Sequence, residues 1–539
     1  MATTTVRSIP ARIRYNRPVT EKVLLRHATR MAVVTMVSRL TGWVRDKALF
    51  WVLGASDLND AFRVAFRIPN AFRALLAEGA LHAAFVPALS PLAGKEETRR
   101  EAQELICGLL AVLLVILATI VGLGMVFAPL LVRLFAQGYA EVPGKLEVTV
   151  LMTRVMFPYL GFISVAALLQ GVLNSHERFL LPAATPIFFN LTLAGMAFFF
   201  AADSEHIALW LGGAVLIGGT LQAAIQWPAV RSLGIRLHPL WAGVRDPAVR
   251  RVLILMLPGI PVLGISQINQ LISTRFASFL GEGGVSILSG AYRVTELMFG
   301  GIVVQMTTVL LPVLSRQLKQ EPEEAPKTLL DTIGLISFVT LPTAVFLLVS
   351  AVPVIGLAFG GGRFGPEAVA VTGATLAAYA FSLVGLGQAK VMASAFFAQR
   401  NTKTPMWCSL GSLAIFTAGC FALVGPMGAP GIGLANTVAV CSYAVILTVV
   451  YGLVFGFGGI SFTPLMTSVG RQLVGCVALF FVALRIQPWL IDVQTTSLAG
   501  LAKVGVAAGL SGGAYLAVVA LLGGREAASM WRGFRGRGA

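Results

Sequence analysis

The sequence has few charged residues for its length. Only 12% of its 539 residues are Asp, Glu, Lys or Arg, about half the share of a typical soluble protein, and 56% are hydrophobic. Apolar runs recur from about residue 31 to residue 523. This composition excludes a soluble enzyme and a protein held by a single membrane anchor. It predicts an all-α polytopic membrane protein.

Cysteine and motifs for nucleotides or metals are also scarce. The five cysteines (Cys107, Cys408, Cys420, Cys441 and Cys476) have no CxxC spacing and lie within apolar runs. Neither a disulfide framework nor a metal site is expected. The sequence has no Walker-type phosphate loop, so it does not encode its own ATPase. We expect no cofactor and no metal, and a transporter rather than an enzyme.

Breaks at Gly, Pro and charged clusters divide the chain into fourteen predicted spans, since about 20 residues cross a bilayer. The spans cover residues 31–54, 60–90, 105–136, 147–173, 180–202, 207–230, 252–280, 285–315, 328–359, 367–398, 405–424, 431–455, 465–485 and 497–522. With both termini cytosolic, and with Arg471 and Arg485 near the ends of the span 465–485 counted with the adjacent loops, 26 of the 41 Lys and Arg residues are cytosolic and only 3 are outer. This asymmetry supports the count and the orientation.

Two pairs of prolines suggest an internal repeat. Pro87 and Pro312 close corresponding spans, and Pro182 and Pro405 open corresponding spans at nearly the same offset. A duplicated six-helix unit explains this spacing, although prolines at span ends are common enough that coincidence stays an alternative. The predicted organisation is a cytosolic basic tail (1–30), an N-lobe (31–236), a cytosolic interfacial linker (237–248), a C-lobe (249–456), two C-terminal helices (463–523) and a cytosolic tail (524–539).

Apart from Arg471 and Arg485, twelve basic residues fall inside the predicted spans: Arg39, Arg45, Lys47, Arg63, Arg67, Arg73, Arg133, Arg154, Arg275, Arg293, Lys390 and Lys503. Each costs roughly 2.5 to 3.5 kcal/mol at the bilayer centre unless it faces water, protein or an opposite charge. Half of them crowd between residues 39 and 73, where Pro69 and Asn70 are expected to interrupt the second span. The first two spans are therefore predicted to line a water-filled cationic vestibule.

Two interpretations of this cluster compete. In the first, Asp46, Asp60 and Glu78 neutralise neighbouring arginines in structural ion pairs. However, residues 39–78 contain six bases and four acids, and ion pairing does not explain the excess. Planar guanidinium groups match phosphate oxygens. The pattern therefore favours a transporter whose central cavity binds phosphate or diphosphate, and no nucleic-acid partner is expected.

Several motifs near the N-terminus carry a family resemblance. Residues 37–46 read VSRLTGWVRD, residues 59–62 NDAF, residues 65–70 AFRIPN and residues 84–87 AFVP. This pattern closely resembles the N-terminal signature of the MurJ (MviN) family of lipid II flippases. That family belongs to the multidrug/oligosaccharidyl-lipid/polysaccharide exporter superfamily. Ala291–Tyr292–Arg293, followed by Glu296, resembles the family's eighth-helix pattern.

The resemblance implies two pseudo-symmetric six-helix lobes plus two C-terminal helices that form a groove for a polyprenyl tail. It implies a flippase that moves lipid II, an undecaprenyl-diphosphate-linked disaccharide-peptide, to the outer leaflet of a bacterial cytoplasmic membrane by alternating access. The substrate-binding residues would be Arg39, Arg45, Arg67, Asn70, Arg73 and Arg293, with Arg45, Arg73 and Arg293 on the diphosphate. Acidic cavity or gating residues would be Asp46, Asp60, Glu78 and Glu296.

The chain also departs from the family pattern. Tyr292 stands where an Asp is common, and Arg63 stands where an apolar aromatic residue is usual. Residues 252–280 and 405–424 contain no Asp or Glu, so the sodium site of some members is not expected. The expected partners are lipid II, membrane lipids and the cell-wall synthesis machinery, with the chain a monomer.

Three rival functions remain at this point. The first is a flippase for another polyprenyl-diphosphate-linked oligosaccharide, of the O-antigen type. The second is a cation-coupled multidrug exporter, for which an acidic and aromatic cavity is expected. The third is a cell-wall scaffold without transport, which would move no lipid.

Overall fold

The computed structural model describes residues 21–75, 81–202, 206–241, 243, 246–257 and 259–524. Within these ranges the chain is helical, and the only β-type pairing is an isolated bridge between Gly361 and Phe364. Helices satisfy their own backbone hydrogen bonds, as a chain surrounded by lipid requires. The all-helical prediction is confirmed.

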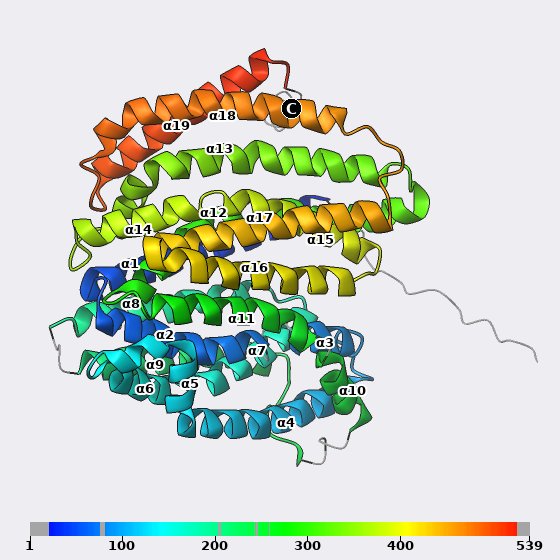
Figure 1. Cartoon of the computed structure of the whole chain (residues 1–539). Coiled ribbons are helices and arrows are strands. Elements are labelled where there is room, and N and C mark those ends of the chain that lie inside the picture. Colours follow the sequence, from blue (N-terminus) through cyan, green and yellow to red (C-terminus); the bar gives the residue numbers. More distant parts are fainter. Residues whose placement is uncertain are drawn as a thin grey trace, which may run out of the picture.

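The first lobe is built from the N-terminal helices (Figure 1). These are α1 (Glu21–Leu53), α2 (Asp57–Arg73), α3 (Leu81–Leu89), α4 (Arg99–Val126), α5 (Ala128–Phe135), the 3-10 helix η2 (Gln137–Glu141), α6 (Lys145–Met156), α7 (Tyr159–Ser175), α8 (Leu180–Phe199) and α9 (Ile207–Arg231). Helix α1 packs along α8, α2 along α6, and α7 along α9. Helices distant in sequence therefore enclose the centre of the lobe.

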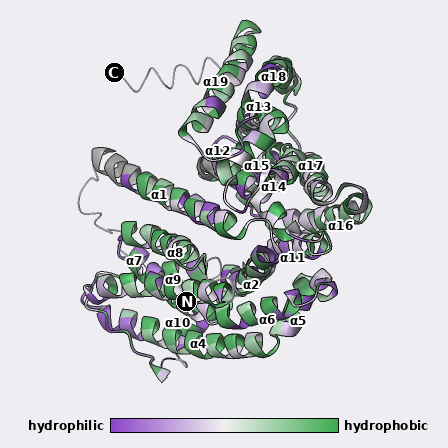
Figure 2. Cartoon of the chain, turned by 90° about the vertical axis from the view of Figure 1, so that its left-hand side faces the viewer, coloured by the Kyte–Doolittle hydropathy of each residue, from purple (hydrophilic) through white to green (hydrophobic). Residues whose placement is uncertain are grey.

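The second lobe follows, with a helical pair on its flank. Its helices are α11 (Gly259–Ala277), α12 (Gly284–Gln320), α13 (Ala325–Phe359), α14 (Pro366–Tyr379), α15 (Ser382–Ala398), α16 (Lys403–Met427) and α17 (Ala429–Val454), followed by α18 (Thr463–Leu490) and α19 (Leu498–Leu521). Helices α18 and α19 pack on each other and on α13, on the side of the C-lobe away from α4 (Figure 2). Two lobes plus two extra helices match the predicted fold class.

The connection between the lobes differs in one respect from the expected organisation. Helix α10 (Pro247–Met256) spans the predicted boundary at residue 249, with all but its first two residues in the predicted C-lobe. It lies against α3 and α4 of the N-lobe, with Val249, Val252 and Met256 buried. Only α11 packs on α16 and α17 of the C-lobe. The predicted span 252–280 is thus two helices on different lobes.

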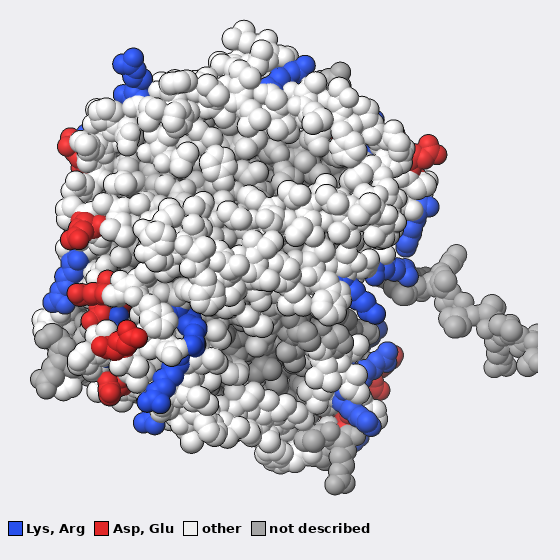
Figure 3. All heavy atoms as spheres, in the orientation of Figure 1, with Lys and Arg blue, Asp and Glu red and all other residues white. Residues whose placement is uncertain are grey.

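The surface agrees with a membrane location. In Figure 3 the charged side chains gather mostly at two opposite edges of the molecule, where the helices end, and an almost uncharged band lies between them. Many apolar side chains in the described part are exposed, such as Phe199 at 85% and Leu453 at 81%. Within the described ranges, 10 helical segments are long and apolar enough to cross a membrane. The total of fourteen spans stays a prediction.

The lobes are joined at the end of the molecule where α1 meets α2. The Lys47 ammonium donates a hydrogen bond to the Gly360 carbonyl, and the Arg363 N–H donates to the Trp51 carbonyl at 2.9 Å. Gly54 forms the turn with φ +70°, and a Cβ there would lie 2.5 Å from the Arg363 carbonyl oxygen. Only glycine tolerates both the backbone conformation and this close approach.

Candidate functional site

An arginine-lined cavity of about 630 Å³ lies between the two lobes. Its walls come from α1, α2, α7, α8 and α9 of the N-lobe and from α11 and α12. Six arginines line it: Arg39, Arg45, Arg63, Arg67, Arg73 and Arg293. Among the residues that the structure describes, the lining carboxylates are Asp46 and Glu296, so the described lining carries six positive and two negative charges. Half of the twelve cations within the predicted spans therefore share one cavity.

Asp46 connects the two lobes inside this cavity. One oxygen, Oδ1, lies 2.7 Å from a terminal nitrogen of Arg45, and the other, Oδ2, lies 2.9 Å from Nε of Arg293. Arg45 also donates to the Asn190 side-chain oxygen at 3.0 Å, and Arg293 pairs with Glu296 at 2.9 Å. Each guanidinium is thereby oriented while part of its donor set remains for a ligand.

Arg39, Arg63 and Arg67 depend less on carboxylate partners than the arginines that pair with Asp46 do. Nε of Arg63 donates to the Asn59 side chain at 2.9 Å, and its guanidinium lies over the Phe50 ring at 4.3 Å. Arg67 donates to the Thr274 hydroxyl of α11. Arg39 has no hydrogen bond or ion pair with any described residue. Cations that lack a protein counter-charge favour an anion in the cavity.

All six residues expected to bind substrate line the cavity. Arg73 and Asn70 come together on the last turns of α2, where Nε of Arg73 donates to the Asn70 oxygen at 2.8 Å. Helix α2 runs on through Pro69 to Arg73, so the interruption expected at Pro69 and Asn70 is absent. The two departures from the family pattern, Arg63 and Tyr292, also line the cavity.

The expected acidic residues are divided between different places. Asp46 and Glu296 line the cavity, whereas Glu78 lies outside the described residues. Asp60 is fully buried and is not among the residues that line the cavity, so of the two expected roles, cavity or gate, the gating role stays a prediction. Its oxygens contact the Lys145 ammonium at 3.0 Å and accept from the Ser286 N–H at 2.8 Å.

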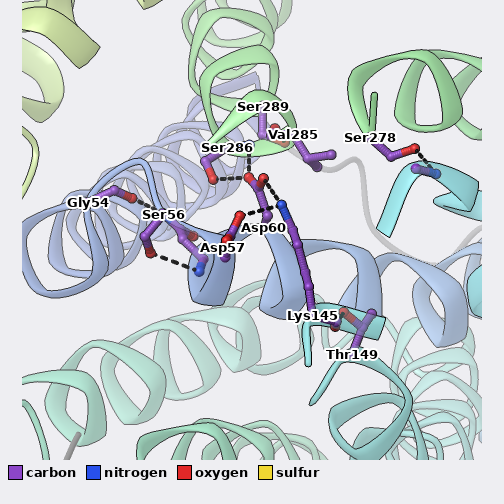
Figure 4. Close-up of polar contacts among 12 residues, drawn as sticks. Gly54, Ser56, Asp57, Asp60, Lys145, Thr149, Ser278, Val285, Ser286 and Ser289 are labelled. Carbon is purple, nitrogen blue, oxygen red and sulfur yellow. Dashed lines mark hydrogen bonds and ion pairs between the residues drawn. The ribbon is translucent and has the colours of Figure 1, made fainter. Parts of the chain in front are cut away.

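This group, which we name the Asp60 contact, consists of the buried residues Asp60, Lys145 and Ser286 together with the partly exposed Asp57 (Figure 4). Lys145 also pairs with Asp57 at 2.6 Å. Because α2 and α6 belong to the N-lobe and α12 to the C-lobe, the group ties the lobes together at the end where α1 meets α2. Sequence reasoning missed Lys145, which looked like a residue of an outer loop.

A second, apolar groove of about 890 Å³ lies beside the arginine cavity. Residues of α12, α13, α18 and α19 form it, with Trp43 from α1. Along α1 the groove residue Trp43 follows the cavity residue Gly42, and along α12 the groove residue Val294 follows the cavity residue Arg293. The groove and the cavity thus lie on neighbouring faces of the same two helices.

A two-lobed helical membrane protein with a charged central cavity belongs to the class of transporters that work by rearranging their lobes. Comparisons with known proteins specify the family. The family model described as "Lipid II flippase MurJ" matches residues 51–499. A protein of Rhizobium meliloti, "Probable lipid II flippase MurJ", is 38% identical over 416 residues, which are 75% of this chain and 76% of the relative.

Solved structures agree on the fold. "Lipid II flippase MurJ, inward closed conformation" has a TM-score of 0.71 at 22% identity and covers 89% of this chain and 98% of its own. A multidrug resistance MATE family transporter of the MOP superfamily, in an inward-facing conformation, has a TM-score of 0.66 at 14% identity, with coverage of 81% and 99%. The chain belongs to the MurJ family, within the fold shared with MATE transporters.

Proposed function

We propose that this protein translocates lipid II from the inner to the outer leaflet of the cytoplasmic membrane. The observation that carries the proposal is the convergence of six arginines on one cavity whose described lining includes two carboxylates. A diphosphate supplies the missing negative charge, and guanidinium donors match its oxygens. Arg45, Arg73 and Arg293 hold the diphosphate, with Arg39, Arg67 and Asn70 around it.

The apolar groove suits the polyprenyl tail. Its lining is almost entirely hydrophobic, and it lies beside the cavity across α1 and α12. A lipid whose diphosphate is bound by Arg293 can therefore place its chain along α12 toward α18 and α19. This gives the two C-terminal helices a role that the six-helix lobes do not supply.

Alternating access requires the lobes to separate at one end and approach at the other. The Asp60 contact closes the end where α1 meets α2, and release of the head group there requires this contact to break. Binding of an anion between Arg45 and Arg293 reduces the repulsion between cations on facing lobes. Membrane potential supplies about 2.3 kcal/mol per charge per 100 mV for moving such charges.

The proposed location is the bacterial inner membrane, with both termini in the cytosol. Support comes from the basic residues at the end opposite the Asp60 contact. There Arg178 donates to the Ser232 hydroxyl at 2.8 Å and Arg99 to the Gly234 carbonyl at 3.2 Å. An excess of Lys and Arg marks the cytosolic side. The protein acts as a transporter rather than an enzyme, as a monomer, in contact with membrane lipids and the cell-wall synthesis machinery.

A complementation experiment tests the function. Bacteria depleted of their own flippase should survive when they express this chain, and they should lyse when they express the Arg45→Ala or Arg73→Ala variant at equal membrane abundance. Survival with both variants would contradict binding of the head group by these arginines. Failure of the unaltered chain to restore export of lipid II would contradict the proposed substrate.

A further inference from the structure

Two glycines, one on each lobe, lie against arginine side chains that reach across from the other lobe. Gly42 is on α1 and Gly300 is on α12. A Cβ atom added at Gly42 would lie 2.9 Å from Nη2 of Arg293, and one added at Gly300 would lie 3.0 Å from Nη1 of Arg39. Since Arg293 belongs to α12 and Arg39 to α1, the arrangement is reciprocal, and each of the two helices contributes one arginine and one glycine.

Other helical glycines make contacts of a different kind. Gly171 on α7, for example, lies against the Phe85 ring of the same lobe, as glycines in closely packed membrane helices commonly do. Among the helical glycines that the structure describes, a guanidinium nitrogen is the nearest neighbouring atom to the added Cβ only at Gly42 and Gly300. Close packing of helix backbones therefore does not account for these two positions.

The Arg293 guanidinium has one nitrogen left for a ligand, and that nitrogen lies over Gly42. Nε lies 2.9 Å from the Asp46 carboxylate, and Nη1 donates to the Glu296 carboxylate at 2.9 Å. Nη2 has no hydrogen bond or ion pair with any residue in the described part of the chain. Gly42 and Arg293 both line the arginine cavity. The two carboxylates thus orient the guanidinium, and Gly42 leaves room for its third nitrogen.

The position of Arg39 depends on Gly300 in the same way. A Cβ at Gly300 would lie 3.0 Å from Nη1 of Arg39 and 3.3 Å from Nη2, so both terminal nitrogens lie over this glycine. Arg39 has no hydrogen bond or ion pair with the residues that the structure describes. The space over Gly300 therefore sets how closely the Arg39 guanidinium approaches α12.

We propose that Gly42 and Gly300 are positioning residues for the arginines that bind the diphosphate. Each glycine leaves the space in which an arginine of the opposite lobe places its terminal nitrogens. Arg39 and Arg293 can then reach one anion from both lobes. The inference rests on the proposed function and adds to it two residues that do not touch the substrate.

Alanine at either position separates positioning from folding. The added Cβ would lie closer to the guanidinium than an ordinary contact of about 3.5 Å. The end of a flexible arginine moves more easily than a helix backbone, so the guanidinium is displaced while the helices keep their places. Because alanine also favours a helix over glycine, the fold should be no less stable.

The test measures the binding of undecaprenyl diphosphate and undecaprenol to the purified full-length protein in nanodiscs. Gly42→Ala and Gly300→Ala should each weaken the binding of the diphosphate lipid about three- to tenfold, because a charge-assisted hydrogen bond is weakened. Undecaprenol affinity and the midpoint of thermal unfolding should not fall. Gly195→Ala on α8 is the control and should change neither affinity, because a Cβ there meets no atom within 4 Å.

Double variants show whether each glycine acts through its own arginine. Lysine ends in a single nitrogen and lacks the terminal fork of arginine. In the Arg293→Lys background Gly42→Ala should therefore have little further effect on affinity, and in the Arg39→Lys background the same should hold for Gly300→Ala. In the exchanged pairs alanine should keep most of its effect.

Two results would overturn the inference without affecting the proposed function. One is a midpoint of thermal unfolding that falls together with the affinity, and the other is an alanine effect that does not depend on which arginine is replaced. If the unaltered protein bound undecaprenyl diphosphate no more tightly than undecaprenol, the proposed function itself would fail.

Discussion

The carboxylate of Asp46 on α1 lies 2.9 Å from Nε of Arg293 on α12. The two residues belong to different lobes, and both line the arginine cavity. In the proposed mechanism, a head-group diphosphate that enters the cavity competes with Asp46 for Arg293. The pair links the two lobes, and we propose that Arg293 also becomes part of the binding site for the anion.

The energetic coupling between Asp46 and Arg293 is measurable in a double-mutant cycle. With Asp46→Asn, Arg293→Gln and the double variant, the free energies of unfolding in detergent should show a coupling of about 1 to 3 kcal/mol, because the Asp46 side chain is largely buried. The exposed pair Arg100–Glu104 is the control, and the effects of substituting its two residues on the free energy of unfolding should be additive. Additive effects of the Asp46 and Arg293 substitutions would contradict a role of this pair in joining the lobes.

The Asp60 contact should contribute strongly to stability. Asp60→Ala leaves the Lys145 ammonium, whose side chain is 2% exposed, with Asp57 as its remaining carboxylate partner. Removing one partner of a buried pair costs about 3 to 5 kcal/mol, and a fall of this size in the free energy of unfolding is expected. Adding Lys145→Met should recover much of the loss.

Asp57→Ala is the matched control for this prediction. The Asp57 side chain is 42% exposed, so its loss should cost far less than the loss of Asp60. Equal destabilisation by Asp57→Ala and Asp60→Ala would show that burial does not govern this contact. Chemical denaturation followed by intrinsic fluorescence supplies the measurement.

The apolar groove can be tested with two glycines on α19. A Cβ atom added at Gly509 or at Gly512 would have no neighbouring atom within 4 Å, so both positions have room for a side chain. Of the two, only Gly512 lines the groove. Gly512→Trp should weaken the binding of lipid II about tenfold, since it displaces part of the polyprenyl chain. Gly509→Trp should bind as the unaltered protein does. Equal affinities for both variants would exclude the groove as the tail site.

Much of the fold could be predicted because hydrophobic length and charge placement act locally. The predicted span 431–455 corresponds to α17, Ala429–Val454, and the span 180–202 to α8, Leu180–Phe199. The arginine cavity was also accessible from sequence, because uncompensated cations inside apolar runs need water or an anion. Arg39, Arg45, Arg67, Arg73 and Arg293 indeed line one cavity.

The remaining features depend on contacts between distant segments. Asp60 has the same helical spacing as Arg63 and Arg67, yet it faces Ser286 and Lys145 rather than the cavity. No local pattern marks Lys145 as its partner. Gln222 and Gln226 on α9 look like ordinary polar residues near the end of a span, and only the fold shows that they line the cavity.

The most direct test of the account is lipid II translocation in proteoliposomes that contain only this protein. The unaltered chain should move labelled lipid II between leaflets, and Arg45→Ala and Arg73→Ala should be at least about tenfold slower, since each loses charge-assisted hydrogen bonds to the diphosphate. Arg133→Ala, an exposed arginine outside the cavity, should match the unaltered rate. Translocation by Arg45→Ala and Arg73→Ala at the unaltered rate would contradict the account.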